Sequence, residues 1–244
     1  MMERLQKVIA NYGYCSRRKA EELIKQGKVI VDNKIITTLG YKVDSSSSII
    51  VDGVLLEKEN KVYFLLNKPR GIISSASDDK KRTTVVDLID TNLRIYPVGR
   101  LDYDTTGIIL LTNDGDFSNM LTSPSNEIEK TYVAKVKGLI LSSEIKKLKS
   151  GVIIDNYKTS PCKIKIKNYN KKTDTSMVEI TIHEGKNHQV KKMFESINHE
   201  VLKLKREKIA FLNLSGVPSG SYRNLTPKEV KQLYVLANKK SSSK

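Results

Sequence analysis

Two carboxylates and a guanidinium lie within one short polar segment of the sequence. Arg100, Asp102 and Asp104 fall between two glycines and are followed by residues 108–111, a β-branched and leucine-rich run typical of a buried strand. A polar loop that leads into a buried strand holds its side chains still, as a catalytic group requires. Because Arg100 is only two residues away, Asp102 should be ionised. Such a carboxylate acts as a nucleophile, a metal ligand or half of a structural ion pair.

The ligand spacing does not favour a metal. A calcium loop that begins at Asp102 needs an acidic or amide group at its fifth position and a bidentate carboxylate at its twelfth, where this chain has Thr106 and Asn113. His183 and His188 are one residue too far apart for a zinc-protease pair, and ordinary hydrogen bonding is expected of them. Phosphate-binding and dinucleotide fingerprints are also missing from the sequence. We therefore expect chemistry without a metal or a cofactor.

A carboxylate without a cofactor can attack the anomeric carbon of a sugar, as in glycoside chemistry. Hydrolysis would then need water and a second acid, and Asp104 is the only near candidate. Isomerisation of a nucleoside needs neither. Asp102 is compatible with both reactions.

The charge of the chain favours a polyanionic partner. Its 244 residues contain 43 Lys and Arg against 27 Asp and Glu, a formal net charge of +16. Nucleic acid is the commonest partner of such a chain, although a lysine-rich surface can also serve solubility alone. The excess is +2 over residues 1–60 and +14 over residues 61–244, so the second part of the chain must itself meet the polyanion.

The cysteines and the hydropathy pattern favour a cytoplasmic protein. Cys15 and Cys162 have neither metal-binding nor redox spacing, which indicates a reducing compartment. The N-terminus has no apolar targeting segment, and no apolar run approaches the length of a membrane span. No feature predicts an oligomer, and we expect a monomer.

The first 57 residues predict a small separate domain. Leu5, Val8 and Ile9 give a short helical face, and Ser16 is the expected N-cap of a helix over residues 17–25. Two hairpins should follow, with strands at residues 28–31, 35–36, 49–51 and 54–56. A basic stripe on the helices suits the phosphates of folded RNA, or is simply a solvated helix face. The RNA-binding candidates are Arg4, Ser16, Arg17, Arg18, Lys19 and Lys28.

Residues 58–61 are a predicted linker, residues 62–238 a second domain and residues 239–244 a flexible tail. Expected strands cover residues 62–66, 108–111, 132–136, 162–166, 177–182 and 201–204, and expected helices cover residues 187–197 and 227–236. A capping box from Thr226 to Glu229 opens the last helix. Strands outnumber helices and follow one another, so the predicted fold class is α+β with a mixed or largely antiparallel sheet.

The N-terminal residues carry a resemblance to a known domain. Residues 16–24 (SRRKAEELI) with residues 27–32 (GKVIVD) resemble the S4 RNA-binding domain of a small-subunit ribosomal protein and of several RNA-modifying enzymes. The resemblance implies binding to structured RNA and does not imply catalysis.

The second domain resembles the pseudouridine synthases. Residues 99–107 (GRLDYDTTG), followed by Asn113-Asp114-Gly115, are similar to their catalytic motif, and Lys68-Pro69 with Gly71 to their first motif. Residues 129–132 (EKTY) resemble the segment that bears their active-site tyrosine, and residues 184–194 (EGKNHQVKKMF) their late basic motif. The motifs stand in the family's order. The nearest group is the one that modifies ribosomal RNA, with its synthases for small-subunit RNA and for large-subunit RNA, and those for large-subunit RNA are nearest.

The resemblance implies a role for four residues. Asp102 would be the nucleophile, attacking C1′ of a target uridine or generating a glycal by elimination at C2′. Tyr132 would stack on the base, and Arg100 would help to hold the flipped nucleotide. Lys191 stands where the family usually has arginine and would keep the aspartate ionised, without the planar fork of a guanidinium. The family uses no cofactor and acts on RNA, here ribosomal RNA.

Each role has a plainer alternative. Tyr132 is also an ordinary strand residue, Lys191 also suits a solvated helix face, and Asp104 is expected to structure the loop by hydrogen bonds to nearby backbone. A non-catalytic ribosome assembly factor on the same fold competes with the enzyme, and an RNA N-glycosidase that releases uracil is a third reading.

Overall fold

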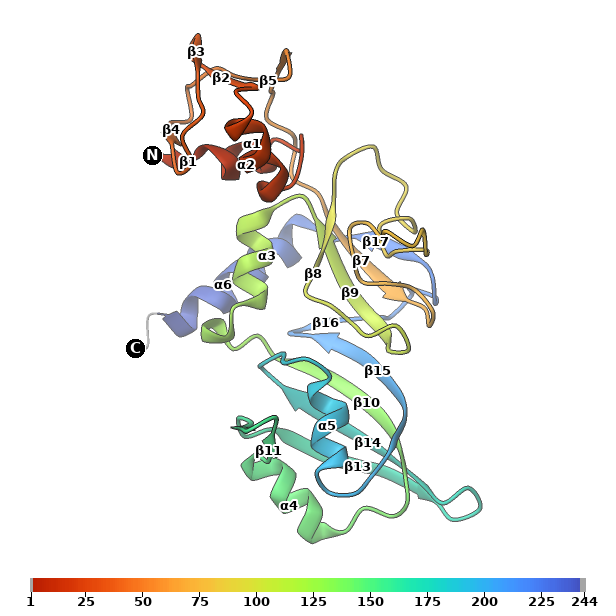
Figure 1. Cartoon of the computed structure of the whole chain (residues 1–244). Helices are drawn as coiled ribbons and strands as arrows, with labels where there is room; N and C mark the ends of the chain where they lie inside the picture. The colour runs from red at the N-terminus through yellow and green to blue at the C-terminus, as the bar shows by residue number, and fades with distance from the viewer. Residues whose placement is uncertain (1, 242–244) are drawn as a thin grey trace. The chain divides into compact units, whose positions relative to one another are not determined.

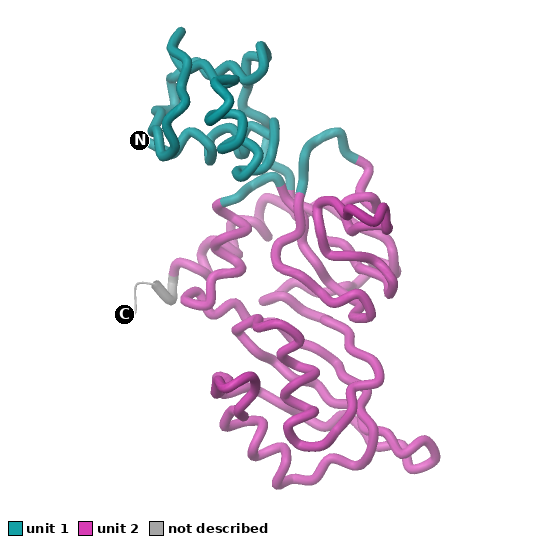
Figure 2. The backbone as a smooth tube through the Cα atoms, in the orientation of Figure 1, with its two compact units in different colours: residues 1–62, 91–95, 113–115 teal, residues 63–90, 96–112, 116–244 magenta. Residues whose placement is uncertain are grey.

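The computed structural model describes residues 2–241, with side chains described as far as residue 238. The chain divides into two compact units (Figures 1 and 2). The first holds the residues up to 62 together with residues 91–95 and 113–115, and the second holds residues 63–90, 96–112 and those from 116 onward.

The first unit packs two helices with short strands. The helices are α1 (Leu5–Asn11) and α2 (Arg17–Lys25), and the strands β2 (Val29–Val31), β3 (Lys34–Ile35), β5 (Ile49–Val51) and β6 (Val54–Leu55) form a sheet in the order β3-β2-β5-β6. Strand β1 (Glu3–Arg4) pairs with β4 (Lys42–Val43). The hydroxyl of Ser16 accepts a hydrogen bond from the Lys19 N–H at 3.1 Å, which caps α2 as the sequence predicts.

Residues 58–61 are fixed within this first unit. The Asn113 side chain accepts a hydrogen bond from the Val62 N–H at 2.9 Å and donates one to the Asn60 carbonyl at 2.9 Å. Lys61 pairs with Asp114 at 3.0 Å. These contacts hold the segment that the sequence predicts to be a linker.

A nine-stranded sheet forms the second unit. Its main path is β13-β14-β10-β15-β9-β7-β17, with β8 paired to β9 and β16 paired to β15. The strands are β7 (Tyr63–Lys68), β8 (Tyr96–Val98), β9 (Thr106–Thr112), β10 (Lys130–Lys137), β13 (Lys163–Asn170), β14 (Thr175–Ile182), β15 (Val201–Ile209), β16 (Leu212–Asn213) and β17 (Tyr222–Asn224). Only the β9–β15 pair is parallel, so the sheet is mixed and the fold class is α+β, as predicted.

Helices and a small hairpin cover this sheet. Helices α3 (Gly115–Thr122) and α6 (Pro227–Ser241) lie beside the β7–β9 half, and α4 (Ser142–Ser150) and α5 (Gln189–Glu195) lie beside the half that holds β10, β14 and β13 (Figure 1). A 3₁₀ turn covers Pro124–Asn126, and β11 (Ile153–Ile154) pairs with β12 (Tyr157–Lys158). A core of Leu65, Ile108, Leu110, Phe117 and Leu233 joins the sheet to α3 and α6.

The hydrophobic pattern sets which side chains face inward. Residues 107–112 of β9 are all buried, as expected of a central strand with no solvent face. Strand β10 alternates, so that Tyr132, Ala134 and Val136 are buried while the residues between them are partly exposed. This alternation places Tyr132 on the inner face of the sheet.

Several elements differ from the sequence prediction. Strand β7 continues through Lys68, where a break was expected, and β15 runs five residues beyond Leu204. Helices α3 and α4 were not predicted. Helix α6 reaches Ser241, so residues 239–241 of the predicted tail are helical, and residues 242–244 lie outside the described part of the chain.

Candidate active site

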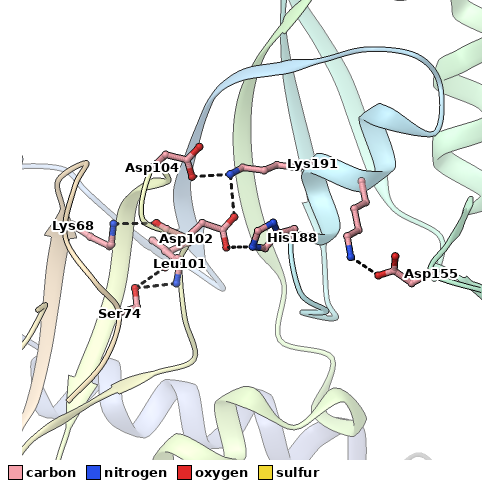
Figure 3. Close-up of polar contacts among 9 residues, drawn as sticks. Lys68, Ser74, Leu101, Asp102, Asp104, Asp155, His188 and Lys191 are labelled. Carbon is pink, nitrogen blue, oxygen red and sulfur yellow. Dashed lines mark hydrogen bonds and ion pairs between the residues drawn. The ribbon is translucent and has the colours of Figure 1, made fainter. Parts of the chain in front are cut away.

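The loop that carries Asp102 connects β8 to β9 and is held by hydrogen bonds on both sides of Asp102. Buried Ser74 donates a hydrogen bond from its hydroxyl to the Leu101 carbonyl at 2.8 Å and accepts one from the Leu101 N–H at 3.1 Å. A turn follows, in which the Thr105 N–H donates to the Asp102 carbonyl at 3.1 Å. The main chain on either side of Asp102 is therefore fixed (Figure 3).

The ammonium of Lys68 holds the same loop from within the fold. Its Nζ donates to the carbonyls of Thr105 at 2.9 Å, Asp102 at 3.2 Å and Tyr103 at 3.4 Å, and to that of its neighbour Pro69 at 3.1 Å. The side chain is fully buried. Burial lowers the pKa of Lys68 to about 8, and the carboxylates of Asp104 and Asp102 oppose that shift. A buried cation thus organises the loop beneath the carboxylates.

The carboxylate of Asp102 is about a quarter exposed and lies beside the side chains of a lysine and a histidine (Figure 3). Lys191 Nζ is 3.3 Å from its Oδ2, and His188 Nε2 is 3.5 Å from its Oδ1. His188 immediately precedes α5 and Lys191 lies within it, 86 and 89 residues further along the chain than Asp102. The fold therefore brings together the two motifs that the sequence predicts to form one site.

Lys191 bridges both carboxylates of the loop. Its Nζ donates a hydrogen bond to Asp104 Oδ1 at 2.7 Å, so Asp104 is its nearer partner. Burial by itself would lower the pKa of Lys191, but the hydrogen bond to Asp104 and the charge of Asp102 raise it above the ordinary value. The same hydrogen bond lowers the pKa of Asp104. Lys191 is thus a cation held between two carboxyl groups.

A buried network holds the start of α5 in place. Glu184 accepts hydrogen bonds from the Tyr157 hydroxyl, the Ser160 N–H at 3.0 Å and the Gln189 side-chain amide. Burial would raise the pKa of Glu184, but these hydrogen bonds, led by that of Tyr157, bring it below the ordinary value. Lys192 also pairs with Asp155 on the β11–β12 turn (Figure 3). These contacts position Lys191 and His188.

Asp102 opens onto a pocket in the second unit. Apolar side chains from several strands and helices form much of its wall: Leu110, Leu121, Ile182, Val190, Leu204 and Ile209. The polar part of the wall consists of Arg100, Asp102, Lys130, Tyr132, Lys186, His188, Gln189 and Arg206. A concave site that combines apolar walls with several polar groups suits a small molecule or a nucleobase.

Three of the four predicted site residues line this pocket. Tyr132 is 8% exposed, and its hydroxyl accepts a hydrogen bond from Arg206 Nη1 at 3.4 Å. Arg100 is exposed and stands two residues before Asp102 in the loop. Lys191 reaches Asp102 from α5 but is not part of the pocket wall. The predicted set therefore converges on one place.

The sequence reasoning missed three residues of the pocket. His188 was expected to make ordinary hydrogen bonds, yet it adopts a left-handed backbone conformation with φ 53° and faces Asp102. Its place inside the late basic motif was the signal available. Lys130 lies beside Tyr132 in the tyrosine motif, but its side chain gave no signal of its own. Arg206 belongs to no motif that we recognised.

The predicted RNA-binding residues lie in the first unit. Arg4, Arg17, Arg18, Lys19 and Lys28 are exposed. Lys19 pairs with Glu22 at 2.9 Å, and Lys28 pairs with Asp52 at 3.2 Å. The hydroxyl of Ser16 is engaged as the cap of α2.

Within residues 2–241 no group of three or more His, Cys, Asp or Glu side chains could hold a metal ion. No helix in that range is both long and apolar enough to cross a membrane.

Comparisons with known proteins agree with the motifs. The model of the RNA pseudouridylate synthase family matches residues 62–196, and that of the S4 domain matches residues 3–49. The chain is 57% identical to the ribosomal large subunit pseudouridine synthase B of Bacillus subtilis (strain 168), over 97% of this chain and 98% of the relative. It is 38% identical to the dual-specificity RNA pseudouridine synthase RluF of Escherichia coli (strain K12), over 98% and 81%.

A solved structure agrees as well. A crystal structure of a pseudouridylate synthase superposes with a TM-score of 0.69 at 32% identity, covering 94% of this chain and 99% of that one. This chain, which carries an S4 domain before its catalytic domain, belongs to the RNA pseudouridylate synthase family.

Proposed function

We propose that this protein converts a specific uridine of ribosomal RNA to pseudouridine, with Asp102 as the nucleophile. The observation that carries the proposal is the Asp102 carboxylate at the wall of a pocket with apolar and polar sides, flanked by the side chains of Lys191 and His188. The relative from Bacillus subtilis is named for the large ribosomal subunit, and we extend that substrate, 23S RNA, to this chain.

Each residue has a chemical task in this proposal. In one route Asp102 attacks C1′ of the ribose, and the bond from C1′ to N1 breaks with its electron pair staying on the uracil. The base turns in the pocket, C5 attacks C1′, and Asp102 leaves with the electron pair of the ester bond. The proton on C5 is lost, and N1 gains a proton. In the other route Asp102 removes a proton from C2′, and the bond from C1′ to N1 breaks as a double bond forms between C1′ and C2′. C5 then bonds to C1′ and C2′ regains its proton, so both routes release the same uracil anion.

The wall of the pocket suits the base and the cations suit the aspartate. Tyr132 offers its ring for stacking, and Arg100 holds the backbone of the extruded nucleotide beside the loop. Lys191 and His188 lie 3.3 and 3.5 Å from the two oxygens of the Asp102 carboxylate and hold it in place for attack. Residues 1–57 act as the S4 domain, with Arg4, Arg17, Arg18, Lys19 and Lys28 meeting phosphates and Ser16 setting the helix that carries three of them.

The experiment that tests the proposal is a map of pseudouridine in ribosomal RNA transcripts. Unmodified 23S and 16S transcripts are incubated with the wild-type protein, and pseudouridine is located by carbodiimide modification and primer extension. We expect one new site, in 23S RNA. Binding without any pseudouridine would favour a non-catalytic assembly factor, and release of free uracil would favour an N-glycosidase.

A further inference from the structure

Two cationic side chains of the Asp102 pocket, buried Arg206 and half-buried Lys130, have no carboxylate partner among the described residues. Arg206 comes from β15 and Lys130 from β10, and both line the pocket. Neither forms an ion pair with an acidic side chain in residues 2–238, whereas Glu129, next to Lys130, pairs with Lys163 at 2.6 Å. A buried charge without a counter-ion is costly, so burying Arg206 without a carboxylate lowers the stability of the fold.

The guanidinium of Arg206 is fixed at two of its three nitrogens. Nε donates to the Ile108 carbonyl at 2.7 Å, and Nη1 donates to the Tyr132 hydroxyl at 3.4 Å. Nη2 is buried and has no hydrogen-bond acceptor within the described part of the chain. Arg206 itself is only 3% exposed. A donor left unused in this way is one that an additional electron-rich group in the pocket would satisfy.

Lys130 adds a second, weakly held cation. Its Nζ reaches only the main-chain carbonyls of Ile128 at 3.3 Å and His183 at 3.4 Å. Burial, and then the charge of Arg206, lower the pKa of Lys130 to about 8. The charges of Lys130 and Arg206 therefore repel each other until a negatively charged group enters the pocket.

We propose that Arg206 and Lys130 stabilise the negative charge of the detached uracil during the reaction. This role rests on the proposed function, because it requires the bond from C1′ to N1 to break with its electron pair staying on the base. The charge then spreads over N1 and the carbonyl oxygens of the ring. As negative charge moves from Asp102 to the uracil, the cations placed to stabilise it change from Lys191 to Arg206 and Lys130.

Such an arrangement favours the reaction and not merely binding. The neutral uracil of the bound substrate gains little from a cationic wall, whereas the anion gains much. Interactions that strengthen as the charge develops are those that lower a barrier. The guanidinium of Arg206 also keeps its place while the base turns, because its hydrogen bonds to the Ile108 carbonyl and the Tyr132 hydroxyl do not involve the substrate.

The test compares two substrates that differ in how well their base carries negative charge. RNA with a target uridine is compared with RNA carrying 5-fluorouridine there, because fluorine withdraws electrons and stabilises the detached anion. Arg206→Gln, Arg206→Lys and Lys130→Gln are measured in the full-length protein, with single-turnover loss of the original nucleoside as the readout at saturating RNA. Lys203→Gln is the matched control, since Lys203 is an exposed cation on β15 outside the pocket wall.

The expected result is an unequal loss. Arg206→Gln and Lys130→Gln should slow conversion of the uridine substrate by about a hundredfold. The same variants should slow conversion of the fluorinated substrate by only about tenfold. Arg206→Lys should recover part of the rate, and Lys203→Gln should match the wild type on both substrates. An equal loss on both substrates would overturn the inference.

Two further outcomes separate a failure of this inference from other failures. Arg206→Gln can unfold the protein, because Arg206 joins β15 to β9; the comparison then rests on Lys130→Gln, which leaves that contact intact. If the wild-type protein makes no pseudouridine, the proposed function itself fails. If it does so and Lys130→Gln slows both substrates alike, only the inference about the cations fails.

Discussion

The ammonium of Lys191 lies 2.7 Å from a carboxylate oxygen of Asp104, closer than its 3.3 Å distance to Asp102. Asp104 is the residue for which only a loop-structuring role was expected. Its contact with Lys191 shows that it also shares the cation that the family resemblance assigns to the nucleophile. Asp104 therefore competes with Asp102 for the ammonium of Lys191 and weakens the attraction between Lys191 and Asp102.

Replacing Asp104 tests this sharing. In Asp104→Asn the hydrogen bond to Lys191 weakens, and Lys191 is left with Asp102 as its one anionic partner in the loop. The turnover rate should change by less than about tenfold, because a partly exposed ion pair contributes little free energy. Lys191→Met should cost more, since both carboxylates then lack their cation. Single-turnover rates at saturating RNA measure both; a larger loss in Asp104→Asn than in Lys191→Met would contradict the sharing.

Lys68→Met removes the ammonium that holds the Asp102 loop. Four carbonyl groups lose a donor, and the buried methionine cannot replace it. The free energy of unfolding should fall by about 3 kcal/mol, and turnover should fall even at temperatures where the variant is fully folded. Urea unfolding followed by circular dichroism measures the first effect. Lys80→Met, at an exposed lysine, is the control and should leave stability unchanged.

Gly107→Ala tests the closest approach of β9 to β15. Gly107 has φ 106°, and a Cβ built there would lie 2.1 Å from the Arg206 carbonyl oxygen. Both the left-handed backbone and the clash should destabilise the variant, by about 4 kcal/mol or more together. Gly216→Ala shares the positive φ but has open space around it, so only about 1 kcal/mol is expected there. Equal losses in the two variants would mean that the close approach does not matter.

The pKa of Lys130 predicts a pH dependence. Because its pKa is lowered to about 8, Lys130 is a cation below that pH and becomes neutral above it. The ratio of the wild-type rate to the Lys130→Gln rate on uridine RNA should thus be largest below pH 8 and fall as the pH rises past it.

The surroundings of Lys130 support that assignment. Arg206 faces it from β15, His183 contributes only its main-chain carbonyl, and the neighbouring carboxylate of Glu129 is paired with Lys163. Asp102, Lys186 and His188 stand elsewhere on the pocket wall. Lys68 has a similar pKa, but it is present in both proteins and cancels in the ratio. A ratio that is constant from pH 7 to pH 9 would contradict the titration of Lys130.

Local patterns explain what the sequence could predict. The apolar run after Gly107 predicts the central strand β9, and the alternation in residues 130–137 predicts which face of β10 carries Tyr132. Ser16 predicts the start of α2 because its cap depends only on residues three positions apart. The motifs, taken as a resemblance, also predicted that Asp102, Tyr132 and Lys191 belong together.

Long-range contacts explain what the sequence could not predict. Lys68 was expected to lie beyond the end of a strand. Its burial is possible because its ammonium donates to the carbonyl of the next residue and to three carbonyls of the Asp102 loop, which is more than thirty residues away in the sequence. Arg206 enters the pocket only because β15 pairs in parallel with β9, a relation that no local period encodes. His188 faces Asp102 because its backbone is left-handed, a conformation that a histidine in the sequence does not predict.

The most direct measurement compares Asp102→Asn with the wild type for both pseudouridine formation and RNA affinity. The two side chains have nearly the same size, so the loop held by Ser74 and Lys68 should stay in place. The account predicts that Asp102→Asn binds the 23S transcript with an unchanged Kd and forms no pseudouridine. Pseudouridine formed by this variant at a rate near that of the wild type would contradict the account.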